Sequence, residues 1–218
     1  MAWIGFNTSG FELERGIGIL QESLKAALDA LEQKHQDTVR EYEDYEVGVA
    51  AGTIEREGEW EDGVQIWEKS QFYDFDLEVI AETVRAVRKA HVVALYHHWE
   101  RTIAAWARYE KALPEGVDKP HHGHLREALL KAEIVPHPRL NAVRDLNNAL
   151  KHNSEDYGKK LLISWPELLP SNFKPRAYTN WYELITLTDS DLSVIAEALI
   201  RSGPSPFLSR NRFMEGLS

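Results

Sequence analysis

Four polar side chains that suit a phosphodiester recur at helical spacing between residues 139 and 154 of this 218-residue chain. On a helical wheel of about 100° per residue, one arc gathers Arg144, Asn148, Lys151 and His152, and the opposite arc gathers the apolar residues. A guanidinium offers a planar fork for phosphate oxygens, and an imidazole can move a proton near neutral pH. The segment therefore predicts a helix with one buried face and one face able to bind a phosphodiester.

RNA is the phosphodiester that these groups fit without a metal. Its 2′-hydroxyl is a built-in nucleophile, so a base for that proton and cations for the charge-rich transition state are sufficient. The alternative is that this polar helix face is only solvated, with Asn141 and Asp145 as its other members.

The same stretch resembles the signature helix of the HEPN superfamily. These proteins are α-helical bundles, often dimeric, and many are metal-independent ribonucleases of toxin–antitoxin and antiviral defence systems. Their hallmark is an arginine, usually followed by a polar residue, with a histidine after four to six intervening residues. Here seven residues separate Arg144 from His152, and Asn147 stands where the tight form of the motif has arginine. The run Tyr96–Glu100 is also similar to helices that precede the motif.

This resemblance spans residues 74–165 and implies a homodimer whose two signature helices form a composite cleft for RNA. It implies catalytic roles for Arg144, as phosphate clamp, and His152, as acid/base. The groups that it places beside the substrate are Asn147, Asn148 and Lys151. It implies no metal and no other cofactor. Independently of the resemblance, His97 and His98 with Glu100 on the long helix could supply an acid or base, or line the same cleft.

Two other functions fit the sequence. A non-catalytic HEPN-like module would use the same bundle to dimerise or to hold a partner protein, and the stretched arginine–histidine spacing and the negative charge favour it. A metal-dependent hydrolase could instead be built on His121, His122 and His124, since imidazole is a common metal ligand. Adjacent histidines rarely converge on one ion, however, so we expect an exposed polar loop there.

Charge and composition narrow the classes of function. The chain has 25 Lys and Arg against 35 Asp and Glu, a net charge of -10, and no cysteine. The cysteine count excludes disulfides and thiolate metal sites, and the net charge argues against non-specific duplex binding. The acidic excess peaks at residues 41–62, with nine acidic residues and one basic residue. This segment is expected to be either solvated or a contact surface for a basic partner protein.

No signal-peptide pattern is visible at Met1–Glu14, and no run approaches the roughly 20 apolar residues of a membrane span. We therefore expect a cytoplasmic protein with no membrane contact.

Hydrophobic periodicity predicts a mainly α fold, a bundle with long antiparallel helices and at most a minor β element. Long helices are expected from Ser9 through about Tyr42 and from Asp74 to about Leu113. Shorter helices are expected over residues 123–133, 138–153 and 188–202, a strand or loop at 64–67 and a brief strand at 183–187.

The expected organisation has three parts within one structural domain. Residues 1–73 form an acidic helical segment, residues 74–202 form the HEPN-like core, and residues 203–218 form a loose tail.

Overall fold

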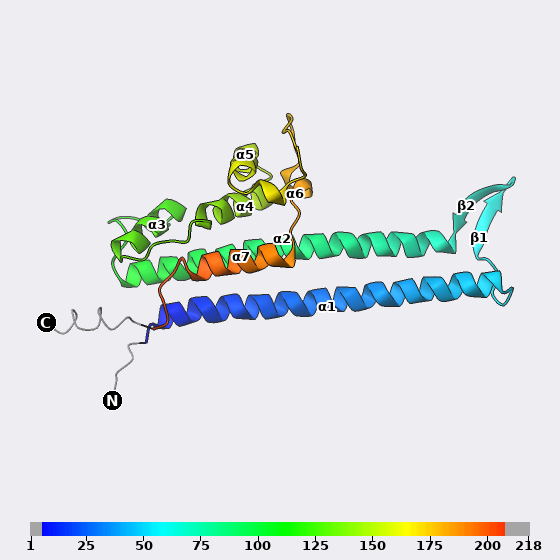
Figure 1. Ribbon diagram of the computed structural model, residues 1–218, viewed down its shortest axis with the longest axis horizontal. Helices are drawn as coiled ribbons and strands as arrows, with labels where there is room; N and C mark the ends of the chain where they lie inside the picture. Colours follow the sequence, from blue (N-terminus) through cyan, green and yellow to red (C-terminus); the bar gives the residue numbers. More distant parts are fainter. Residues whose placement is uncertain (1–5, 208–218) are drawn as a thin grey trace. The chain divides into compact units, whose positions relative to one another are not determined.

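The computed structural model describes residues 6–207, which form helices and one small sheet (Figure 1). In chain order the elements are α1 (Thr8–Ala50), β1 (Gly58–Glu61), β2 (Val64–Glu68), α2 (Lys69–Tyr109), α3 (His122–Lys131), α4 (Leu140–His152), α5 (Glu155–Ser164), the 3-10 helix η1 (Pro166–Leu168), α6 (Trp181–Leu184) and α7 (Asp189–Ile200). The mainly α fold is confirmed. Among the described residues, no helix combines the length and the apolar character that crossing a membrane requires.

Both predicted long helices exist with shifted ends. The first begins at Thr8 because the Asn7 side chain caps it, accepting a hydrogen bond from the Gly10 amide at 3.1 Å. It continues to Ala50 and is followed by Gly52, whose φ of +70° is a left-handed conformation that suits glycine. The second begins at Lys69, directly after β2, so it starts earlier than the expected Asp74.

The chain separates into two compact units. Unit 1 comprises Met1–Glu22 and Lys89–Ser218, and unit 2 comprises Ser23–Arg88. Both long helices run through both units, so this division differs from the expected boundary between residues 73 and 74.

The core of unit 1 is built on the second half of α2. Trp99 and Ile103 are fully buried there, and the indole nitrogen of Trp99 donates a hydrogen bond to the Ser202 carbonyl at 2.7 Å. Pro204 and Pro206 are buried, and the Asn7 amide donates to the Pro206 carbonyl at 2.8 Å. Residues 203–207 are thus packed rather than loose, while residues 208–218 of the expected tail lie outside the described residues.

The predicted buried face of α4 is confirmed. Its apolar residues Leu140, Val143, Leu146, Ala149 and Leu150 are all buried. The helix packs against α5, α6 and α7, and Figure 1 shows it alongside α2 in unit 1. It ends at His152 because Asn153 adopts a left-handed conformation with φ of 47°.

No helix was expected from the sequence over Glu155–Ser164, where α5 lies with Gly158 inside it. The role of this glycine is packing: a Cβ at Gly158 would lie 2.0 Å from the ring of Trp181, so only glycine lets the indole approach. The predicted strand at residues 183–187 was wrong. Asn180 caps the short helix α6 instead, and the following extended residues make one backbone hydrogen bond, from the Thr186 amide to the Leu168 carbonyl at 2.9 Å.

Unit 2 carries the sheet, an antiparallel hairpin that joins α1 to α2 (Figure 1). Asp62 and Gly63 form its two-residue turn with φ of 51° and 77°, the left-handed conformations that such tight hairpins need. Within unit 2 the two long helices pack through Tyr42 and Tyr73, whose rings stack with centroids 5.3 Å apart. At residues 64–67, where the sequence left a strand or a loop open, the structure has the strand β2.

Candidate functional site

Arg144 lies on the predicted polar face of α4, and its guanidinium is bound by the next residue. Its Nε and Nη2 donate to Oδ1 of Asp145 at 2.9 and 2.7 Å. The Arg144 side chain is 28% exposed and that of Asp145 is 7% exposed. A guanidinium held by a buried carboxylate has its charge compensated locally, and that pairing also prevents the carboxylate from being buried alone.

His152 and Lys151 are both exposed at the last turn of α4. His152 lies eight positions after Arg144, which corresponds to about 12 Å of rise along the helix axis. Within one chain the structure therefore does not bring the two predicted catalytic side chains together.

The two asparagines of the motif differ in environment. Asn147 is 2% exposed, and its amide nitrogen makes only a long contact of 3.4 Å with the side-chain oxygen of Asn148. The side-chain oxygen of Asn147 has no hydrogen-bond partner. Asn147 thus faces the interior of unit 1, whereas Asn148 is partly exposed with Arg144 on the polar face.

A polar network that is buried at Tyr96 and His122 lies beside this face and joins three helices. The Tyr96 hydroxyl of α2 lies 2.9 Å from Nδ1 of His122 on α3, and Nε2 of His122 lies 3.0 Å from Oδ1 of Asn141 on α4. Because the amide oxygen can only accept, Nε2 carries the proton and Nδ1 accepts from the tyrosine. Burial lowers the pKa of His122, which keeps this single-proton form, and burial raises the pKa of Tyr96.

Sequence reasoning missed Tyr96 and His122 as a pair. The sequence showed the two residues only separately: Tyr96 in the run Tyr96–Glu100, and His122 among the three histidines at positions 121, 122 and 124. Nothing in the spacing tells which of the three histidines faces inward.

Glu100 pairs with His97 rather than with His98. Its Oε2 lies 3.3 Å from Nδ1 of His97, one turn earlier on α2. Burial raises the pKa of Glu100, while the nearby charges of His97 and Lys151 lower it, and the rise prevails. A histidine oriented by a carboxylate keeps its other ring nitrogen available for proton transfer.

His98 serves the packing of α1 on α2 in unit 1. Its imidazole occupies the space left by Gly16, where a Cβ would lie 2.2 Å from the ring, and its Nε2 lies 3.2 Å from the Glu12 carbonyl. This contact gives the predicted site residue a structural role.

A groove runs between α1 and α2 in unit 1, beside the His97–Glu100 pair. It consists of two adjoining hollows of about 530 and 410 Å³ that share Gly16, Ile19, His98 and Arg101. His97 lines the first hollow and Arg15 the second. We call this feature the α1–α2 groove. It combines an orientable imidazole with two guanidinium groups, a set suited to a phosphate backbone.

The three histidines at the start of α3 are used in three different ways. His122 belongs to the buried network, His121 accepts a hydrogen bond from the Gly123 amide at 3.0 Å, and the His124 ring stacks on that of His121. Across residues 6–207, no group of three or more metal-ligating side chains has the geometry to hold an ion. The rings therefore do not converge as a metal-dependent hydrolase would need.

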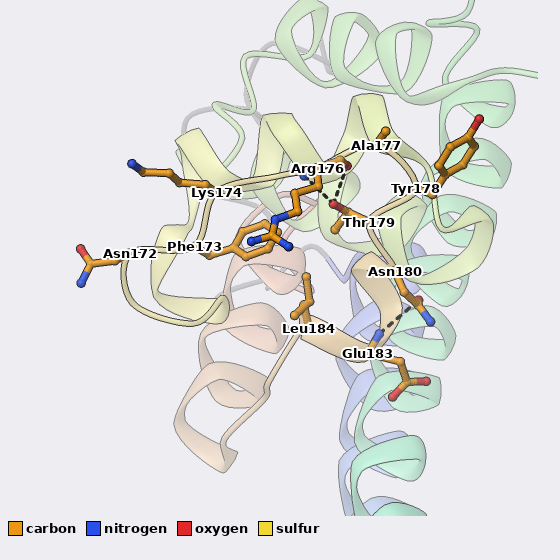
Figure 2. Close-up of a pocket in the computed structure, with 10 residues that line it drawn as sticks. All are labelled: Asn172, Phe173, Lys174, Arg176, Ala177, Tyr178, Thr179, Asn180, Glu183 and Leu184. Atoms are coloured by element: carbon orange, nitrogen blue, oxygen red, sulfur yellow. Dashed lines mark hydrogen bonds between the residues drawn. The ribbon is translucent and has the colours of Figure 1, made fainter.

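A second cleft, of about 640 Å³, lies between the loop at residues 172–180 and α6 (Figure 2). Arg176 turns its guanidinium inward across the ring of Phe173, while Lys174 and Tyr178 point away. The backbone amide of Arg176 donates to the Thr179 hydroxyl at 2.9 Å, which closes the loop turn. With one inward cation and no acid–base pair, this cleft could hold an anion but offers no evident catalytic group.

Comparison with known proteins adds no relative: no family model matches this chain, and no curated protein or solved structure matches it.

Proposed function

We propose that the protein is a HEPN-like helical protein that binds RNA in the α1–α2 groove and cleaves it without a metal. The observation that carries the proposal is the dual position of His97. Its imidazole pairs with Glu100 and also lines the groove that contains Arg101. An acid–base group and a phosphate-binding cation thus lie on one surface.

The chemistry follows from these groups. His97 takes the proton of a 2′-hydroxyl, the 2′-oxygen attacks the adjacent phosphorus, and the bond from phosphorus to the 5′-oxygen breaks. The products are a 2′,3′-cyclic phosphate and a 5′-hydroxyl, and the leaving oxygen receives its proton from an acid. Arg101 and Arg15 stabilise the extra negative charge on the phosphate oxygens.

The residues at the end of α4 extend this site. Burial raises the pKa of Glu100 and the charge of Lys151 opposes that rise, which supports a role for this cation beside the acid–base pair. His152 is proposed as the acid for the leaving oxygen, with Arg144 and Asn148 as positioning groups. In a homodimer, as in the HEPN resemblance, the same residues of a second copy would complete a composite cleft.

RNA cleavage in EDTA tests the proposal. We expect His97→Gln to lower the rate at least a hundredfold, the usual contribution of an acid–base group. His35→Gln is the matched control, because His35 is an exposed histidine of α1 in unit 2. His152→Ala tests the second proton transfer separately. Cleavage that survives both His97→Gln and His152→Ala would remove the ribonuclease assignment.

A second function, a non-catalytic HEPN-like binding module, is favoured by two specific observations. Arg144 is already paired with Asp145, and a buried Asn147 stands where the tight motif has arginine. Such a protein would bind RNA or a partner without cutting. Intact RNA recovered from a complex that Arg101→Gln weakens would support this function over cleavage.

The wider setting is part of the proposal. We place the protein in the cytoplasm, as a homodimer in a defence or toxin–antitoxin system. Light scattering tests the dimer. Growth arrest on expression, relieved by His97→Gln, tests the toxin role.

A further inference from the structure

The entire net charge of the chain belongs to unit 2. Residues 23–88 contain 7 basic and 17 acidic residues, a net charge of -10, which equals that of the whole protein. Unit 1 is neutral by the same count. A surface that is this acidic repels phosphodiesters, so the RNA proposed for unit 1 is not a ligand for unit 2.

Unit 2 also exposes an unusual amount of apolar surface for its size. Half of the large hydrophobic side chains that are exposed within residues 6–207 belong to it. They are Val47, Ile54, Trp60, Val64, Ile66, Trp67, Phe72, Phe75 and Val79. Clustered exposed hydrophobic residues mark interaction sites more often than isolated ones do.

The hairpin places aromatic rings and carboxylates together. The indole nitrogen of Trp67 donates to Oε2 of Glu59 at 3.1 Å, and the Trp67 ring meets that of Phe72 edge to face with centroids 5.6 Å apart. Trp60 lies on the opposite face of β1, over Gly58, because successive side chains of a strand alternate. Trp67 is 37% exposed, so part of its ring is open to a ligand on the face that it shares with Glu59.

The hairpin is fixed in position within unit 2. Arg56 forms an ion pair with the buried Glu68, and Lys69 pairs with Glu57 at 2.6 Å. The Glu57 amide donates to the Tyr45 hydroxyl of α1 at 2.9 Å. A surface held this way loses little conformational freedom when it binds.

We propose that this hairpin is a docking surface for an arginine- and lysine-rich segment of another protein. We define the hairpin surface by Glu59, Glu61, Trp67 and Phe72. Indole faces attract guanidinium and ammonium groups, and the neighbouring carboxylates bind the same groups directly. A second copy of this chain is the poorer occupant, because two such acidic surfaces repel each other.

A peptide titration of the full chain tests the proposal. The probes are a synthetic peptide of alternating arginine and valine and its counterpart with glutamine in place of arginine. We expect saturable binding of the basic peptide only, with a change in tryptophan fluorescence. Trp67→Ser should raise its Kd about two- to fivefold, the contribution of an exposed cation–π contact. Circular dichroism checks that the variant is folded.

A matched pair of double variants separates recognition from general charge attraction. Glu59→Gln with Glu61→Gln changes the hairpin surface, and Asp76→Asn with Glu78→Gln makes the same change of net charge on exposed residues of α2. We expect the first pair to weaken binding more than the second.

Three results overturn the proposal: equal weakening by both pairs, equal binding of the glutamine peptide, or self-association that Trp67→Ser abolishes. The last would make a second copy the occupant. None of these results bears on RNA cleavage by unit 1.

Discussion

Replacing Tyr96 with phenylalanine removes a single oxygen from the buried network of unit 1. The ring is 1% exposed and its hydroxyl donates to Nδ1 of His122 at 2.9 Å, so the variant leaves that nitrogen buried without a donor. An unsatisfied buried polar group costs about 1–3 kcal/mol. In a chain of this length each kcal/mol lowers Tm by about 2–4 °C, so Tm should fall by at least about 2 °C.

Urea unfolding followed by circular dichroism measures the effect. Tyr109→Phe is the control, because Tyr109 is 84% exposed and the loss of its hydroxyl should change the free energy of unfolding by less than about 0.5 kcal/mol. Both variants remove the same atom, so only the environment differs between them.

A double-mutant cycle with His122→Leu attributes the loss to the pair. Because the two side chains are hydrogen-bonded, the combined variant should deviate from additivity by at least about 0.5 kcal/mol. If Tyr96→Phe is as harmless as Tyr109→Phe, or if the cycle shows no coupling, the network does not stabilise the fold as argued.

Two further predictions concern packing and pH. Gly158→Ala should destabilise the protein by about 1–3 kcal/mol because its Cβ would collide with Trp181, whereas Gly18→Ala, with open space around it, should be neutral or stabilising; equal effects in urea unfolding would contradict the packing argument. Burial lowers the pKa of His122 and of His91 below the ordinary 6.5, so below that pH the unfolded chain takes up protons that the folded chain does not. The free energy of unfolding should therefore fall as pH drops through 6.5 and level off above it, and His122→Gln should flatten the profile; a variant with the slope of the wild type would refute this origin.

The amphipathic face of α4 could be predicted because burial follows its helical period directly. The ion pair of Arg144 with Asp145 could not be predicted in this way. The two residues lie about 100° apart on the wheel, and their charged groups meet only because the arginine side chain is long. The hydrogen bond of His122 is with Tyr96, which lies 26 residues earlier, so a local spacing pattern does not predict this contact. The need for glycine at position 158 could not be predicted for the same reason, since it comes from the contact with Trp181 on another helix.

The chain crosses from one unit to the other within helices, at Glu22–Ser23 of α1 and at Arg88–Lys89 of α2. A protease needs several residues of extended chain in its cleft, and neither crossing offers them. The exposed stretch at residues 51–57 does. Limited digestion should therefore nick the molecule there first and leave both crossings uncut, so fragments that match the units will have to be made by gene design rather than by trimming the native chain.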